Sequence, residues 1–298
     1  MSIAPCRSAL VALSAVLAAG CATRDASTLA PVARAQAPAP ARVARTCDAR
    51  AFGAVGDGRA KDTAALQRAI EACATGDGGT VVLARGTFVS GTIVLRSHVT
   101  LRIEAGATLL GSRDDADYPT QAPPIRNTEL ANCRRALVYA EGATAVRIEG
   151  GGTIDGNADI DKWRGMARRE GERPMAIFTA LSSDVSIEGI TVRNAATWAV
   201  VNLEVTHLVV RGITVDSPLG PTHDGIDVVD GRDVLIEDNT ITAGDDGICL
   251  KSGSATGLRD VVVRRERPAV DRPAGHPTDV AVPELESAGH HRVLRGRS

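Results

Sequence analysis

The sequence predicts an all-β protein that folds as a right-handed parallel β-helix, a solenoid of stacked coils with one capping helix near its N-terminus. From residue 80 onward, short β-branched and aliphatic runs alternate with glycine-containing turns. One of these runs recurs at spacings of 39, 23, 26 and 27 residues, which is typical of a structural repeat. A β-sandwich is the alternative, but sandwiches lack such near-constant self-similarity.

The composition fits one globular domain with tails. The 298 residues are 44% hydrophobic and 23% charged, and the formal net charge is −2. That charge excludes the strongly basic field typical of nucleic-acid binding, so no nucleic-acid partner is expected. Aromatic residues make up 2% of the chain, which argues against aromatic-rich binding platforms.

Residues 1–21 are predicted to be an export signal. Arg7 precedes an apolar run at 9–19 that is shorter than a membrane span. Residues 17–21 resemble a bacterial lipobox, in which Cys21 would be lipidated; a plain secretory signal is the alternative. Because Ala22 is not a retention Asp, the expected location is the outer membrane as a lipoprotein, or the periplasm or exterior.

The folded domain is predicted to span residues 47–263, after an Ala- and Pro-rich linker at 22–46. It begins in residues 52–58 with a short strand that ends in glycine-rich turns. A helix capped by Asp62 follows, with apolar residues at helical spacing: Leu66, Ala69, Ile70 and Cys73. Such a helix would cover one end of an apolar core.

Short strands fill the rest of the domain. Five are expected before the repeat, at residues 80–83, 87–89, 92–95, 99–103 and 108–110. The repeat strand is expected at 146–150, 185–189, 208–212 and 234–238, with a partial copy at 261–264. The pattern then stops, so residues 264–298 are predicted to be an aperiodic, disordered tail, either functional or the product of a frameshifted reading frame.

The cysteines show no metal-binding pattern. Cys47, Cys73, Cys133 and Cys249 follow the signal, and none forms a paired C-x-x-C. Export would allow a Cys47–Cys73 disulfide, and two buried free thiols are an equally weighted alternative.

Residues 222–253 contain a repeated acidic motif. Asp224-Gly225-Ile226 recurs as Asp246-Gly247-Ile248, 22 residues later. Aligned on this motif, Asp246 falls in the column of Asp224, Asp245 falls beside His223, and Trp198 occupies the same column one coil earlier. Because neighbouring coils lie about 4.8 Å apart, the three carboxylates should be close together.

Such a cluster favours acid–base chemistry. Mutual repulsion should raise the pKa of at least one carboxyl group. A protonated carboxyl beside ionised ones can protonate a glycosidic oxygen while a partner activates water. A Ca²⁺ site and a ladder of turn-capping Asp residues are the alternatives.

These motifs resemble glycoside hydrolase family 28, the polygalacturonase-like enzymes of the pectin-lyase-like β-helix fold. Residues 52–58 with Asp62-Thr63 match a weakly specific entry motif that phage tailspikes share. Residues 152–156 with Trp163 are similar to a family element beside the substrate groove. The strong matches are residues 222–227 and 244–246, and the resemblance covers about 47–263.

The resemblance implies inverting hydrolysis of α-linked galacturonan in pectin by a monomer that needs no cofactor or metal. Asp245 would be the general acid, and Asp224 and Asp246 would hold and activate the attacking water. The residues expected to bind substrate are His223, Lys251, Trp198 and Trp163.

The sequence also departs from the family pattern. Thr222 stands where the family usually has Asn, and the family's Gly-His-Gly and Arg-x-Lys coils are not recognised. The chain as written is therefore expected to have low stability and weak activity. Two alternatives to a hydrolase stay open: a non-catalytic polysaccharide-binding or degenerate β-helix, and a pectate lyase-like enzyme that uses Ca²⁺ and an Arg or Lys base.

Overall fold

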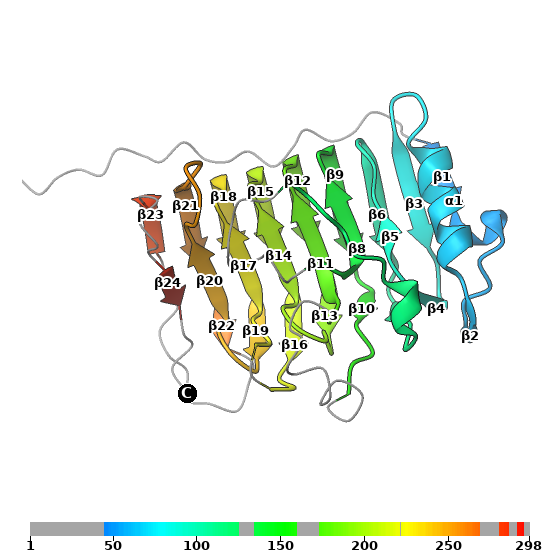
Figure 1. Cartoon of the computed structure of the whole chain (residues 1–298). Helices are drawn as coiled ribbons and strands as arrows, with labels where there is room; N and C mark the ends of the chain where they lie inside the picture. The colour runs from blue at the N-terminus through cyan, green and yellow to red at the C-terminus, as the bar shows by residue number, and fades with distance from the viewer. Residues whose placement is uncertain are drawn as a thin grey trace, which may run out of the picture. The chain divides into compact units, whose positions relative to one another are not determined.

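The chain folds into stacked coils, each built from short strands that belong to three sheets (Figure 1). The computed structural model describes residues 45–124, 134–159, 173–220, 222–268, 280–285 and 291–294. All of them lie within one unit of the chain, residues 35–298. In each complete coil the chain passes from sheet A to sheet B to sheet C, and each strand pairs in parallel with its equivalent in the next coil.

Sheet A holds the repeat strands. Its order is β1 (Arg45–Asp48), β3 (Gly79–Leu83), β6 (Val99–Ile103), β9 (Thr144–Gly150), β12 (Ser183–Glu188), β15 (Thr206–Arg211), β18 (Arg232–Glu237), β21 (Leu258–Arg264) and β23 (Val280–Leu285). One residue of every repeat strand pairs in the same row: Val146, Val185, Leu208, Val234 and Val261. The repeat spacing therefore gave the correct register.

Sheets B and C complete each coil. Sheet B contains β2 (Asp57–Lys61), β4 (Gly86–Ser90), β7 (Ala107–Gly111), β10 (Thr153–Asp155), β13 (Thr191–Arg193), β16 (Thr214–Ser217), β19 (Thr240–Ala243) and β22 (Arg267–Pro268). Sheet C contains β5 (Ile93–Val94), β8 (Ala136–Glu141), β11 (Met175–Ala180), β14 (Val200–Leu203), β17 (Ile226–Val229), β20 (Ile248–Lys251) and β24 (His291–Leu294). The five strands expected between residues 80 and 110 correspond to β3–β7.

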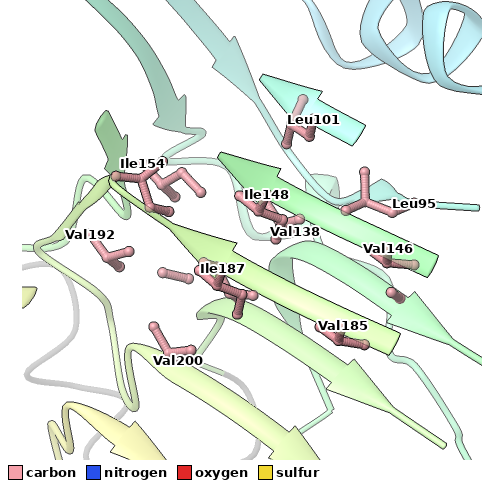
Figure 2. Close-up of a cluster of buried hydrophobic side chains, with 14 of the residues drawn as sticks. Leu95, Leu101, Val138, Val146, Ile148, Ile154, Val185, Ile187, Val192 and Val200 are labelled. Atoms are coloured by element: carbon pink, nitrogen blue, oxygen red, sulfur yellow. The ribbon is translucent and has the colours of Figure 1, made fainter. Parts of the chain in front are cut away.

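Rows of aliphatic side chains form the core between the sheets. Figure 2 shows Leu101, Ile148 and Ile187 stacked on neighbouring strands of sheet A, and all three are fully buried. Burying one such side chain contributes roughly 1.5–3 kcal/mol. The core is therefore a continuous column, and each coil is stabilised mainly by the coils on either side of it.

The predicted helix is α1 (Thr63–Cys73), and it lies beside β1 and β3 at the N-terminal end of the sheets (Figure 1). Leu66, Ala69 and Ile70 are buried, as the helical spacing predicted. The expected cap by Asp62 is correct in position only: Asp62 is the N-cap residue of α1, and its backbone carbonyl accepts the Leu66 N–H at 2.9 Å. Its carboxylate makes no capping hydrogen bond to the helix and instead accepts the N–H groups of Val55 and Gly56, at 2.6 and 3.0 Å.

The strand predicted for residues 52–58 was wrong. The 3-10 helix η1 (Ala49–Phe52) occupies its start, and β2 begins only at Asp57. Gly53 and Gly56 have φ of 95° and 65°. These left-handed conformations interrupt an extended chain and favour glycine. A second 3-10 turn, η2 (Asp115–Asp117), follows β7.

Of the two states considered for Cys47 and Cys73, the structure contains the disulfide, with the Cα atoms 6.1 Å apart. It joins β1 to the last residue of α1. Cys249 is a free, buried thiol, and Cys133 lies outside the described residues.

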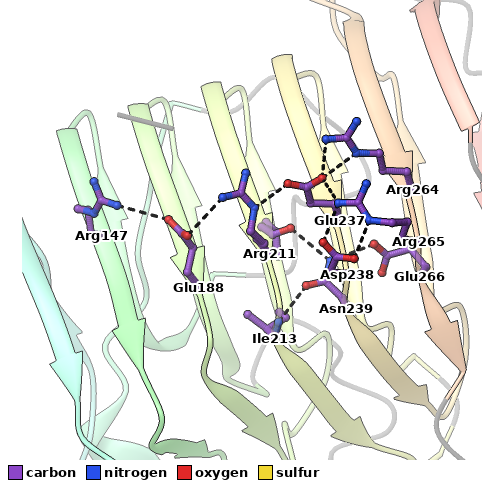
Figure 3. A network of polar contacts seen from close by, with 11 residues as sticks. Arg147, Glu188, Arg211, Ile213, Glu237, Asp238, Asn239, Arg264, Arg265 and Glu266 are labelled. Atoms are coloured by element: carbon purple, nitrogen blue, oxygen red, sulfur yellow. Dashed lines mark hydrogen bonds and ion pairs between the residues drawn. The ribbon is translucent and has the colours of Figure 1, made fainter. Parts of the chain in front are cut away.

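A ladder of ion pairs runs along sheet A from β9 to β21 (Figure 3). Arg147 contacts Glu188 at 3.4 Å, and Glu237 accepts from both Arg211 and Arg264 at 2.6 Å. Because the partners stand on successive coils, each pair links one repeat to the next. The arginines are partly exposed and Glu237 is buried. Partly exposed pairs such as Arg147–Glu188 contribute about 0–1 kcal/mol each.

The structure differs from the predicted tail at three short strands among the described residues. β22 pairs parallel with β19. β23 pairs antiparallel with β21, and β24 pairs antiparallel with β20. The prediction of a disordered tail relied on the lack of side-chain alternation in residues 264–298. A segment without such alternation can still form a strand, because the unpaired backbone groups of an edge strand can pair with it. The predictions for Cys21, Trp163 and residues 1–44 concern residues outside the described part of the chain. Within the described part, no helix is long and apolar enough to span a membrane.

Candidate active site

The acidic residues lie in two loops that lead from sheet B into sheet C. The first loop, residues 218–225, joins β16 to β17 and carries Asp224. The second, residues 244–247, joins β19 to β20 and carries Asp245 and Asp246. Equivalent loops of neighbouring coils stack, so the two copies of the motif lie next to each other.

The backbone confirms the column predicted from the repeat. Ile226 pairs with Ile248, and the Gly225 N–H donates to the carbonyl of Asp246 at 2.9 Å. One coil earlier, the Ala199 N–H donates to the carbonyl of Asp224 at 2.9 Å, which places Trp198 next in the column. Asp224 and Asp246 therefore occupy equivalent positions on adjacent coils.

Gly225 is needed for close approach of the two coils. A Cβ at this position would lie 2.4 Å from the carbonyl oxygen of Gly247 and 2.7 Å from Ile241 Cγ2. The φ of Gly225 is not in the left-handed region, so its backbone conformation does not require glycine. The lack of a side chain is what lets the two acidic loops pack together.

The three carboxylates meet as predicted, with one oxygen of each within 4.8 Å of the others. Asp224 is buried, Asp246 is half-buried and Asp245 is exposed. Burial is the largest cause that raises the pKa of Asp224; Lys251 opposes it, and Asp245 and Asp246 add to it. Repulsion alone, which the sequence argument invoked, is thus the smaller contribution.

Lys251 is enclosed within the site. Its Nζ lies 2.6 Å from Asp227 Oδ1, 3.3 Å from Asp224 Oδ2 and 3.8 Å from the centre of the Trp198 ring. The residue is only 7% exposed. The sequence predicted that Lys251 and Trp198 contact substrate, whereas the structure brings these two side chains into contact with each other.

Asp227 and Cys249 occupy paired positions on β17 and β20. Asp227 is fully buried, and burial raises its pKa to about 8 despite the opposing charge of Lys251. The Cys249 Sγ lies 3.6 Å from Asp224 Oδ2 and 3.5 Å from Asp246 Oδ2. Burial also raises the pKa of this thiol, so it remains protonated and its single hydrogen can be donated to either carboxylate.

Thr222 connects Asp245 to a buried arginine. The Thr222 N–H donates to Asp245 Oδ2 at 3.1 Å, and its Oγ1 accepts from Arg173 Nη2 at 2.5 Å. Thr222 has a φ of 64°, which is strained for a β-branched residue. His223 is buried next to it, with Nδ1 3.0 Å from the carbonyl oxygen of Gly220.

Among the residues that the structure describes, two overlapping groups have ligand atoms close enough for a cation: Asp224 with Asp227 and Cys249, and Asp224 with Asp245 and Asp246. In the first group, the ammonium of Lys251 already contacts two of the three residues. A metal there would face a fixed positive charge. The second group has carboxylate oxygens only, the donors that Ca²⁺ prefers.

Most of the predicted site residues come together: the three catalytic candidates, His223, Lys251 and Trp198. The sequence did not predict the ion pair between Asp227 and Lys251. A signal for it was present, because Asp227 is the fourth residue of the repeated Asp-Gly-Ile-x motif that contains Asp224. Arg173 had no signal in the sequence, because it follows no repeat; it reaches the site through Thr222.

Residues 76–263 match the sequence family described as "Glycosyl hydrolases family 28". A probable polygalacturonase of Vitis vinifera is 32% identical over 213 residues, which cover 68% of this chain and 43% of the relative. An exo-poly-alpha-D-galacturonosidase of Dickeya chrysanthemi is 36% identical over 159 residues, which cover 50% of this chain and 25% of the relative. The chain thus spans less than half the length of these two relatives.

The fold is also similar to solved structures. The family 28 exopolygalacturonase of Yersinia enterocolitica matches with a TM-score of 0.64 and 26% identity, over 71% of this chain and 46% of that one. A polygalacturonase of Erwinia carotovora matches with a TM-score of 0.65 and 21% identity, over 76% of this chain and 64% of that one. These likenesses confirm the right-handed parallel β-helix.

Proposed function

Because the chain belongs to glycosyl hydrolases family 28, we propose that it hydrolyses α-linked galacturonan, the acidic backbone of pectin. The observation that carries the proposal is the convergence of Asp224, Asp245 and Asp246 within 4.8 Å on adjacent coils. The names of the polygalacturonase relatives support the same substrate class.

The graded exposure of the three carboxylates supports a division of roles. Asp245 is exposed and can reach a glycosidic oxygen, to which it would donate a proton as that oxygen leaves the anomeric carbon. A water molecule would form the new bond to that carbon. Its proton would pass to the carboxylates of Asp224 and Asp246, which face each other across one coil spacing.

Inversion of the anomeric carbon is proposed from the family resemblance. Inverting glycosidases generally separate their carboxyl groups by roughly 6.5–9.5 Å, whereas one oxygen of each carboxylate here lies within 4.8 Å of the others. A water held jointly by Asp224 and Asp246 beside the acid would accommodate the shorter spacing. The anomer of the first product, observed by NMR, distinguishes inversion from retention.

The alternatives make different chemical demands. A lyase needs an Arg or Lys side chain that can act as a base. Lys251 is a basic residue in direct contact with the acidic column. Its contacts with Asp224 and Asp227 favour a charged ammonium, a poor base, and they raise its pKa against the effect of burial. A binding protein without turnover would not need the acidic column, which puts like charges together.

The test compares the parent chain with Asp245→Asn on polygalacturonate, by release of reducing ends. We expect hydrolysis by the parent and a loss of about 10²–10⁴-fold in the variant, as for removal of a general acid. Asp77→Asn, an exposed Asp in the turn after α1, is the matched control. Undetectable hydrolysis by a folded parent, or an unsaturated uronate product seen by its ultraviolet absorbance, would reject the hydrolase.

We further propose that the protein is exported and carries lipid on Cys21. The Cys47–Cys73 disulfide supports export, because such bonds persist in oxidising compartments. Incorporation of a labelled fatty acid into the chain, and its loss in Cys21→Ala, would support lipidation. A cleaved but unlabelled protein would indicate the plain secretory signal instead.

A further inference from the structure

The side chain of Lys251 already has partners in every direction that its charge can use. An ammonium group has three donor hydrogens. Asp227 and Asp224 each accept from it, and its cationic face lies on the Trp198 ring. A uronate carboxylate could reach Lys251 only by displacing one of these contacts, in a region where the residue is 7% exposed.

The backbone sets this arrangement. Lys251 is the last residue of β20, and Val229 is its paired neighbour on β17. Its Nζ reaches the Asp227 carboxylate, two residues back along that neighbouring strand, and the Asp224 carboxylate in the loop before it. The lysine on β20 therefore links Asp224, in the acidic column, to Asp227 on the neighbouring strand β17.

We propose that Lys251 is a positioning residue for Asp224, held in place by Asp227 and Trp198, and that it does not contact substrate. The inference rests on the proposed function for its catalytic consequence. A carboxylate that accepts the proton of water must be ionised and correctly oriented. The buried ammonium supplies both, because it favours the negative charge of Asp224 and fixes one of its oxygens.

The other ionisable groups around Asp224 do not replace this contact. Burial is the largest cause that raises the pKa of Asp224, and the charges of Asp245 and Asp246 in the loop before β20 add to it. Asp227 on β17 is an acid that shares Lys251 with Asp224, so it supplies no positive charge of its own. Cys249 on β20 donates from a neutral thiol. His223 turns Nδ1 towards the Gly220 carbonyl, and Arg173 contacts Thr222 and Ala196.

The kinetic test is Lys251→Met, which keeps the length of the side chain and removes its charge. On polygalacturonate, we expect kcat to fall about 10- to 100-fold, because a misplaced base is costly, while KM stays within about threefold. The acidic limb of the kcat profile should move up by about one pH unit, since a base without its cation needs a higher pH to ionise. A raised KM with unchanged kcat would overturn the proposal and restore a substrate contact.

Two further variants test whether the effect of Lys251→Met comes from the lost charge at this position. Lys251→Arg keeps the charge, so its acidic limb should return to the parental position even if kcat stays reduced; a limb shifted as in Lys251→Met would contradict the proposal. Lys61→Met is the matched control. Lys61 is half-exposed and paired with Asp114 and Asp117, so its loss should change neither kcat nor the pH profile.

A measurement without turnover separates this inference from the proposed function. Carbon-13 NMR titration of aspartate carboxyls, with the Asp224 signal assigned through Asp224→Asn, should show a higher pKa for Asp224 in Lys251→Met than in the parent. If the parent hydrolyses nothing, the proposed function fails while this shift still supports the positioning contact. An Asp224 carboxyl that titrates identically in both proteins would overturn the inference.

Discussion

The Gly225 N–H donates to the carbonyl of Asp246 at 2.9 Å, a hydrogen bond that joins the two acidic loops directly. It continues the ladder between β17 and β20 by one residue beyond the strands. The spacing of the carboxylates is thus inherited from the spacing of the coils. Any change that separates these coils should act on the candidate site and on stability together.

Gly225→Ala should therefore lower both stability and activity. The new Cβ would meet the Gly247 carbonyl oxygen at 2.4 Å, and such overpacking costs typically 1–3 kcal/mol. Urea unfolding should show this loss, and hydrolysis should fall at least tenfold because the acidic loops move apart.

Gly212→Ala is the control: Gly212 has a φ of 60° with no atom within 4 Å of the added Cβ. It should lose about 1 kcal/mol from backbone strain and no activity. Equal activity losses in the two variants would contradict this account.

The repeat made much of the fold predictable. Every repeat strand carries an inward aliphatic pair, such as Val185 and Ile187, and a solenoid buries equivalent residues of successive coils in the same row. The acidic column followed from the same logic, because an alignment of repeats is an alignment in space. The N-terminal strand was mispredicted where left-handed glycines, which the repeat does not cover, direct the chain.

The surroundings of the acids could not be read from the repeat. Lys251 is an end-of-strand residue, and such residues are commonly solvated; its burial depends on Trp198, 53 positions earlier in the chain. Arg173 approaches Thr222 from outside the repeat pattern. Such contacts depend on side-chain directions in three dimensions, which periodicity does not encode.

Thr222→Asn should stabilise the protein. Thr222 is held at a φ of 64°, and asparagine tolerates this conformation better than a β-branched residue, by roughly 0.5–1 kcal/mol. The N–H that donates to Asp245 belongs to the backbone, so activity should persist. Thr222→Val keeps the branched side chain but removes the acceptor used by Arg173, and should lose about 1–2 kcal/mol. Urea unfolding of the two variants should move in opposite directions; a destabilised Thr222→Asn would count against strain at this position.

Reduction of the Cys47–Cys73 disulfide should destabilise the N-terminal end of the solenoid. The bond closes a chain segment with a sequence separation of 26 residues, for which loop-closure entropy gives about 3–4 kcal/mol. The midpoint of urea unfolding should therefore fall when reductant is added. The double variant Cys47→Ala/Cys73→Ala should unfold at a lower urea concentration with or without reductant. A parent protein indifferent to reductant would show that the disulfide contributes little to stability.

Glu266 should make stability depend on pH. Its Oε1 accepts a hydrogen bond from Asn239 Nδ2, and the Asn239 side-chain oxygen Oδ1 accepts the Ile213 N–H (Figure 3). Burial raises the pKa of Glu266 to about 7, so between its ordinary value and pH 7 the folded state binds more protons than the unfolded state. Stability from this group is therefore complete at low pH and is lost as pH rises towards 7, by about 1–2 kcal/mol after allowing for partial exposure.

Glu266→Gln removes this titration while keeping a carbonyl oxygen for Asn239. The free energy of unfolding, measured in urea at pH 5 and pH 8, should change less in the variant than in the parent, and the difference between the two changes isolates Glu266. Glu104→Gln, at an exposed position, should keep the parental pH dependence. If Glu266→Gln loses as much stability between the two pH values as the parent, then Glu266 is already ionised in the folded state at pH 5. The carboxyl would then have to be solvated or paired with a nearby cation, with Arg265 on the adjacent residue as the first candidate.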